Sequence, residues 1–158
     1  MTAVTTLVPW YGSNRSLAHA IGDLAQGWRY VVVPFAGGMC ETLHFGDARG
    51  LLLNDLHPHL INLAQAVKRW PDELAAILRL QTFDPDTLDE ARRTCRTLGA
   101  GRSPGLFAVD ADPMTRDRQL RYAAAYFYAS WCQRNGVAGT KGEFRDAPPC
   151  YRFDDGGG

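Results

Sequence analysis

The sequence predicts an α/β chain, and three features of its apolar pattern indicate this class. The run WRYVVVPF at residues 28–35 is rich in β-branched residues and stops at a proline, as a buried strand does where the chain turns. A second short apolar run, GLLLND at 50–55, also ends on polar residues. Farther along, the segments 58–80 and 115–134 carry apolar residues at helical spacing. A small parallel sheet combined with several helices is therefore expected.

The first half of the chain predicts a βαβ unit. The loop VPWYGSNRS leads into a short segment with helical spacing at Leu17, Ala20, Ile21 and Leu24. Between the two strand-like runs, GGMCETLHFGDA is long enough for a helix of about three turns. Strand, glycine turn, helix and strand in this order form a βαβ unit.

The second half is expected to be mainly helical. The segment 58–80 opens at Pro58, is interrupted at Pro71 and then resumes, and another helix follows from Pro85. Aromatic residues surround the predicted helix 115–134 on too many sides for a surface helix, so most of it is expected to be buried. The final segment, 135–158, is rich in Gly and Pro and predicts loop or a short hairpin.

Composition bounds the class of protein. The chain has 158 residues, 46% of them hydrophobic, which suits one globular domain. Its 17 basic and 17 acidic residues balance, so a nucleic acid would have to be met by a local patch. The four cysteines form no CxxC pair, which predicts a reduced, cytoplasmic protein without a metal site. No apolar run is long enough to span a membrane.

A glycine turn and a later acid are the first candidate binding features. Gly37 and Gly38 follow the first strand-like run, and Asp55 ends the second at about the 20-residue spacing at which an acid meets a ribose. Because GxGxxG is absent, the pattern favours a nucleoside ligand without a pyrophosphate, a description that S-adenosylmethionine fits. The alternative is a simple tight turn, with Asp55 capping the helix that follows.

Four segments carry a resemblance to a known family. PWYGSNRSL, PFAGG, NDLHPHLINL and FYASWCQRNGVAGTKGEF, in this order, resemble the adenine-specific DNA methyltransferases of the DNA adenine methylase class. The resemblance implies a partial Rossmann-like fold that binds S-adenosylmethionine, with a helical insertion and the start of a target-recognition region. It also implies methyl transfer to the exocyclic amine of adenine in double-stranded DNA, with the target base flipped out.

The resemblance also assigns site residues. It places Trp10 near the cofactor, makes the Pro34 to Gly38 segment the cofactor turn and makes Asp55 the acid of the site. The expected cofactor residues are Trp10, Asn14, Arg15, Pro34, Phe35, Gly37, Gly38 and Asp55, and the expected DNA contacts are Arg134, Asn135 and Lys141. Two positions depart from the family pattern, since Asn14 replaces a lysine and Val33 replaces a glutamate.

The family's catalytic motif, Asp-Pro-Pro-Tyr, does not occur in the sequence. DAPPCY, at residues 146–151, holds the same letters in a broken arrangement, so the catalytic residue stays unknown. Residues 1–75 are expected to form the cofactor-binding part and 76–158 the target-recognition part. The chain is expected to be an N-terminal part of such an enzyme, or half of a split enzyme whose second polypeptide brings the motif. The alternatives are a non-catalytic DNA-binding relic and a domain that binds another nucleoside.

Two further clusters have competing interpretations. His57-Pro58-His59 is either the start of a metal site or a solvated helix entrance, and with no third ligand nearby the second is favoured. The second cluster is basic and comprises Arg116, Arg118, Arg121, Arg134, Lys141 and Arg145. It is either a phosphate-contacting surface or a solvated helix start balanced by nearby acids.

Overall fold

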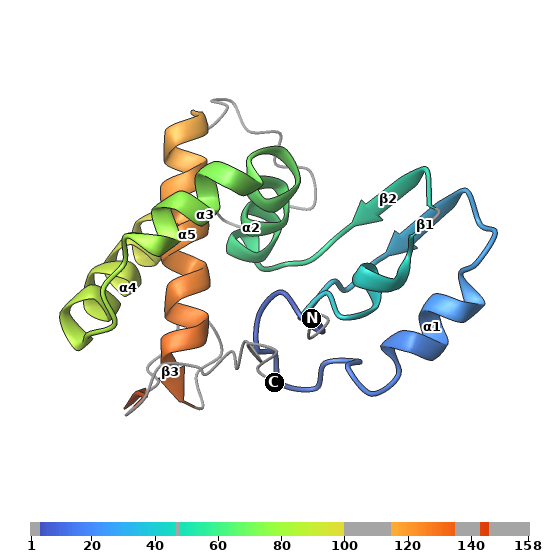
Figure 1. The fold of residues 1–158 in the computed structure, drawn as a ribbon, viewed down its shortest axis with the longest axis horizontal. Coiled ribbons are helices and arrows are strands. Elements are labelled where there is room, and N and C mark those ends of the chain that lie inside the picture. The colour runs from blue at the N-terminus through green and yellow to red at the C-terminus, as the bar shows by residue number, and fades with distance from the viewer. Residues whose placement is uncertain (1–3, 47, 100–114, 135–142, 146–158) are drawn as a thin grey trace, which may run out of the picture.

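The computed structural model describes residues 4–46, 48–99, 115–134 and 143–145, and all structural statements below refer to these. Figure 1 shows two groups of elements, a helical group of α2 to α5 and a two-stranded sheet with α1 beside it. The elements are α1 Ala18–Leu24, β1 Tyr30–Val33, the 3-10 helix η1 Glu41–His44, β2 Gly50–Leu53, α2 Pro58–Arg69, α3 Pro71–Arg79, α4 Pro85–Gly99, α5 Arg116–Cys132, β3 Gln133–Arg134 and β4 Glu143–Phe144.

The strands β1 and β2 pair in parallel, as the sequence predicts. Tyr30 lies opposite Gly50 and Val33 opposite Leu53. Hydrogen bonds continue the pairing past both strands, because the Asn54 N–H donates to the Val33 carbonyl and the Ala36 N–H donates to the Asn54 carbonyl, each at 2.9 Å. The turn after β1 is thereby held beside the polar end of β2.

The connection between these strands differs from the prediction. The prediction of a helix of about three turns is wrong, because only the four-residue 3-10 helix η1 forms there. Gly37 and Met39 have φ angles of 49° and 59°, in the left-handed region that a right-handed helix excludes. The turn therefore uses up the first residues of the segment, and too few remain for a long helix.

Prolines set the starts of three helices, as predicted. α2, α3 and α4 each begin at a proline, which needs no N–H partner in the first turn. Trp70, between α2 and α3, has φ −142° and ψ 56°, so the chain leaves helical geometry for one residue. The Trp70 N–H donates to the Ala66 carbonyl at 2.8 Å and closes α2. The predicted interruption at Pro71 is confirmed.

Helix α5 lies at the centre of the helical group. It packs against α2, α3 and α4, and most of its length is buried, as the aromatic pattern predicts. Tyr126 and Ala123 are fully buried and meet Leu60 and Leu63 of α2 in one hydrophobic core. At the C-terminal half of α5, the Tyr128 hydroxyl donates to the Thr82 carbonyl at 2.7 Å and fixes the entry to α4.

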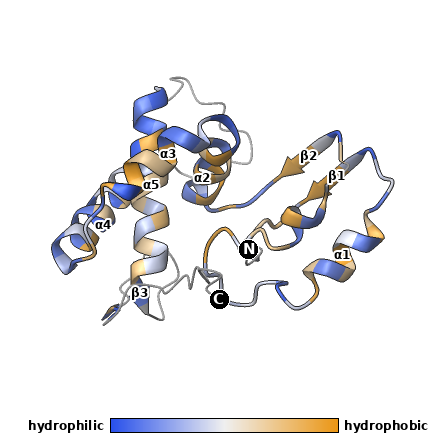
Figure 2. Cartoon of the chain, in the orientation of Figure 1, coloured by the Kyte–Doolittle hydropathy of each residue, from blue (hydrophilic) through white to orange (hydrophobic). Residues whose placement is uncertain are grey.

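The β1–β2 sheet is largely exposed. Tyr30, Val32 and Leu52 are 73%, 61% and 63% exposed, although all three are apolar or aromatic. Figure 2 shows these strands as a hydrophobic segment that stands apart from the helical group. Among the described residues, β1 and β2 pair only with each other, so both outer strand edges lack a partner strand.

Two further features concern the class of protein. Cys40, Cys95 and Cys132 are buried and free, in agreement with a reduced protein. In the described part of the chain, no helix combines the length and apolar character needed to cross a membrane.

His59 of α2 is buried in the core against Tyr126. The two rings are stacked, with centroids 5.4 Å apart and an interplanar angle of 12°. Burial lowers the pKa of His59 to about 4, with a further lowering from His57, while a hydrogen bond to the Cys95 backbone acts in the opposite direction. His59 is therefore neutral in the folded protein at neutral pH.

This burial predicts an acid-sensitive core. Below pH 6.5 the unfolded chain binds a proton on His59, and the folded chain does so only near pH 4, so stability should fall across this window and level off below it. Between pH 7 and pH 4.5 the loss due to His59 should be roughly 2 kcal/mol. His59→Phe keeps a ring against Tyr126 but cannot titrate. Urea unfolding of both proteins at the two pH values should show a smaller acid loss in the variant, and equal losses would contradict the assignment.

Candidate functional site

A cavity of about 330 Å³ lies where three distant segments meet. These segments are the N-terminal loop, the turn after β1 and the end of β2, and the volume falls within the ~300–1,000 Å³ typical of small-molecule sites. The lining residues are Trp10, Gly12, Ser13, Asn14, Phe35, Ala36, Gly37, Gly38, Glu41 and Asp55.

Asp55 joins the parts of this cavity. One carboxylate oxygen accepts a hydrogen bond from the Gly37 N–H at 3.0 Å, and the other accepts from the His57 N–H at 2.9 Å. The carboxylate thus ties the glycine turn to the segment that starts α2. Each oxygen keeps a second lone pair that a ligand hydroxyl or ammonium could use. Asp55 can therefore hold the glycine turn in place and still contact a ligand.

The glycine pair brings the N-terminal segment against the turn. Gly37 needs its positive φ, and a Cβ there would lie 3.4 Å from the Trp10 ring. At Gly38 a Cβ would lie 2.9 Å from the Thr6 hydroxyl and 3.1 Å from the Val8 carbonyl oxygen. The Leu7 N–H also donates to the Gly38 carbonyl at 3.0 Å. A side chain at Gly38 would therefore push the N-terminal loop away from the turn, whereas at Gly37 the positive φ is the constraint that favours glycine.

The helical group holds the other side of the N-terminal loop. The Trp10 ring meets the His57 ring edge to face at 5.8 Å, and His57 lies 5.3 Å from the Tyr126 ring of α5. The indole N–H of Trp131, also on α5, donates to the Leu7 carbonyl at 3.2 Å. The position of the cavity wall therefore depends on the packed helices as well as on the sheet.

Most of the predicted cofactor residues meet at this cavity. Trp10, Asn14, Phe35, Gly37, Gly38 and Asp55 line it. Arg15 and Pro34 are exposed and are not among the lining residues. The Pro34 carbonyl instead accepts a hydrogen bond from the Asn54 side-chain amide at 2.9 Å, which holds the turn to the end of β2.

Glu41 was not singled out from the sequence. It opens η1, lines the cavity and is only 7% exposed. Among the described residues, its carboxylate has no hydrogen-bond or ion-pair partner. An acid shortly after the glycine pair, in an otherwise apolar stretch, is the signal that could have drawn attention to it.

One of the candidate DNA contacts, Arg134, follows the C-terminal end of α5. Arg134 belongs to β3 and its backbone pairs antiparallel with Glu143 of β4. The Arg145 N–H donates to the Cys132 carbonyl at 3.0 Å, so the returning strand is fixed to the end of α5. Asn135, Lys141 and the DAPPCY segment lie outside the described residues.

Comparison with protein families decides the class. The family model for D12 class N6 adenine-specific DNA methyltransferases matches residues 10–142, a span that includes every residue lining the cavity, the helices α1 to α5 and β3. The chain belongs to this family. The protein is therefore an enzyme of adenine methylation in DNA, as the resemblance implies, and its family generally takes the methyl group from S-adenosylmethionine. A search of curated proteins found no match.

The glycine turn gives a direct test of the cavity's architecture. Gly38→Ala should cost about 1–3 kcal/mol of unfolding free energy, because the new methyl group overlaps the Thr6 hydroxyl and the Val8 carbonyl. Gly46→Ala is the matched control, since no atom lies within 4 Å of a Cβ at that position. Urea unfolding should separate the two variants, and a Gly38→Ala protein as stable as the control would show that the loop does not need this close approach.

Proposed function

We propose that this protein binds S-adenosylmethionine in the cavity between Trp10, the Phe35 to Gly38 turn and Asp55, for transfer of its methyl group to adenine in duplex DNA. The proposal is supported by the convergence of three separate segments that resemble the family on one cavity. A tight turn without a binding role would not require residues from three distant segments to line one cavity.

The lining of the cavity suits the chemistry of this cofactor. S-adenosylmethionine carries a sulfonium cation, an ammonium group and a ribose diol, all of which are favoured by nearby carboxylates. Asp55 and Glu41 supply two carboxylates, one of them buried. Trp10 and Phe35 offer aromatic surface for the adenine ring, and Phe35 is 79% exposed and so accessible to a ligand. Asn14 adds polar groups for the amino-acid end.

In this proposal the chain's own residues act by binding and positioning. Asp55 holds the Gly37 amide and the cofactor together, so the turn and the ligand share one anchor. Trp10, fixed from behind by His57, closes the cavity from the N-terminal side. The bound cofactor supplies an electrophilic methyl group, and orienting it toward the DNA is the contribution expected of these residues.

The division of labour along the chain also forms part of the proposal. Residues 1–75 are proposed to bind the cofactor and residues 76–158 to recognise the target, with Arg134, Asn135 and Lys141 as DNA contacts. The exposed apolar face of β1 and β2 favours a further protein partner that covers it, such as a second polypeptide that brings the catalytic motif.

Calorimetry tests the cofactor site. The folded protein should release or absorb heat with S-adenosylmethionine, and Asp55→Asn should weaken binding by about tenfold or more, because it removes a charge-assisted contact. Asp72→Asn, an exposed acid of α3, is the matched control and should leave the affinity within about twofold. Absence of binding for S-adenosylmethionine, together with binding of another nucleoside, would reject the proposed ligand.

A transfer assay tests the second polypeptide. Methyl transfer to adenine-containing duplex DNA should be weak or absent with this chain alone and should rise when the protein encoded by its genomic neighbour is added. Full activity of the chain alone would reject the need for a partner.

A further inference from the structure

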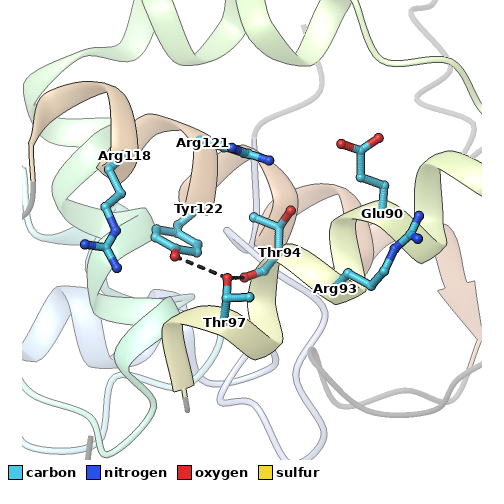
Figure 3. Close-up of a pocket in the computed structure, with 7 residues that line it drawn as sticks. All are labelled: Glu90, Arg93, Thr94, Thr97, Arg118, Arg121 and Tyr122. Atoms are coloured by element: carbon cyan, nitrogen blue, oxygen red, sulfur yellow. Dashed lines mark hydrogen bonds between the residues drawn. The ribbon is translucent and has the colours of Figure 1, made fainter. Parts of the chain in front are cut away.

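A second and larger cleft, of about 640 Å³, lies between α4 and α5 and shares no lining residue with the cofactor cavity. Figure 3 shows its two walls. On α4 they comprise Glu90, Arg93, Thr94 and Thr97, and on α5 Arg118, Arg121 and Tyr122. Three of the seven lining residues are arginines, and one is acidic, so the cleft has an excess of positive charge in a chain whose net charge is zero.

The arginines of the cleft differ from their neighbours on the same helices. Arg92 pairs with Asp89, and Arg116 pairs with Glu73. In the part of the chain that the structure describes, no ion pair involves Arg93, Arg118 or Arg121, and all three are exposed. Guanidinium groups gathered without acid partners keep their donors available for an anion.

Tyr122 and Thr97 form the floor of the cleft, and Tyr122 contacts one of the arginines. The Tyr122 hydroxyl lies 3.2 Å from the Thr97 hydroxyl, and the Tyr122 side chain is 7% exposed. The Arg118 guanidinium lies over the Tyr122 ring, 5.6 Å from its centroid. The pKa of Tyr122 is lowered, first by the hydrogen bond with Thr97 and to a smaller extent by Arg118 and Arg121, while burial acts in the opposite direction.

We propose that this cleft binds phosphate groups of the DNA backbone. The planar donor fork of arginine matches phosphate oxygens in two-point contacts, and three such forks around one cleft suit a phosphodiester better than a carboxylate or an apolar ligand. Because the three arginines are exposed to solvent, a DNA strand that passes over the cleft can reach them. This inference rests on the proposed binding of duplex DNA.

The cleft is separate from the hairpin that the sequence marks for target recognition. Along α5, Arg118 and Cys132 are separated by about 21 Å at 1.5 Å per residue, and Arg134 of β3 lies two residues beyond Cys132. Contacts in the cleft would therefore add affinity and orientation without reading bases. Helix α5 would connect the two, with the cleft near its N-terminal half and β3 after its C-terminal end.

Salt-dependent DNA binding tests this proposal. In fluorescence anisotropy with a labelled adenine-containing duplex between 50 and 200 mM salt, Arg93→Gln and Arg121→Gln should each reduce the slope of log affinity against log salt by about one, and the double variant by about two. Arg49→Gln, an exposed arginine next to β2 and outside the cleft, is the matched control and should leave the slope unchanged.

Two further variants separate charge from structure. Arg121→Lys keeps the charge and should restore most of the slope, which a purely structural role would not predict. Glu90→Gln removes the acid of the cleft and should raise DNA affinity by about two- to threefold at low salt. Unchanged salt slopes in both Arg93→Gln and Arg121→Gln, with unaltered thermal unfolding of the two variants, would overturn the proposal.

The source of the phosphate is tested by competition. Inorganic phosphate at matched ionic strength should not displace the duplex beyond the effect of added salt, and selective displacement by phosphate would show a site for the free anion and overturn the assignment to DNA. Calorimetry with S-adenosylmethionine should give the same affinity for the arginine variants as for the unaltered protein. If the unaltered protein does not bind S-adenosylmethionine, the proposed cofactor site is rejected, but the result for DNA binding at the cleft is not affected.

Discussion

The carboxylate of Asp55 is the contact on which the rest of the site depends. It accepts hydrogen bonds from the turn after β1 and from the start of α2, so it lies where the parallel sheet meets the helical group. The two glycines before it let the N-terminal loop approach the turn closely enough to form a wall. A charged group partly enclosed by donors is held in a fixed position, and that is the condition for binding a small cationic ligand with directional contacts.

Helix α5 supports this site and links it to the proposed DNA contacts. Tyr126 packs against the histidines that stand behind Trp10, and Trp131 bonds to the N-terminal loop directly. The same helix forms one wall of the arginine-lined cleft and continues into β3.

Most elements could be predicted from local features. Prolines mark the starts of α2, α3 and α4, and the β-branched runs mark β1 and β2, because these residues restrict the backbone directly. The prediction of a helix between the strands was wrong because Met39 has a left-handed backbone conformation. A methionine rarely adopts this conformation, so its residue type gave no sign of it. Glu41 was missed for a related reason, since its burial follows from the fold of η1 and not from its spacing.

The sequence by itself determined the family, the order of the two paired strands and the helices after them, and most of the residues that line the cavity, though not Glu41, because these depend on residue types and their spacing. Only the tertiary structure decided that Asn14 lines the cavity while Arg15 does not, and that Arg93 on α4 lines the same cleft as Arg118 on α5. Such pairings depend on how helices and loops pack across long separations in the chain, and the energy of that packing is shared among many side chains. No local pattern records it.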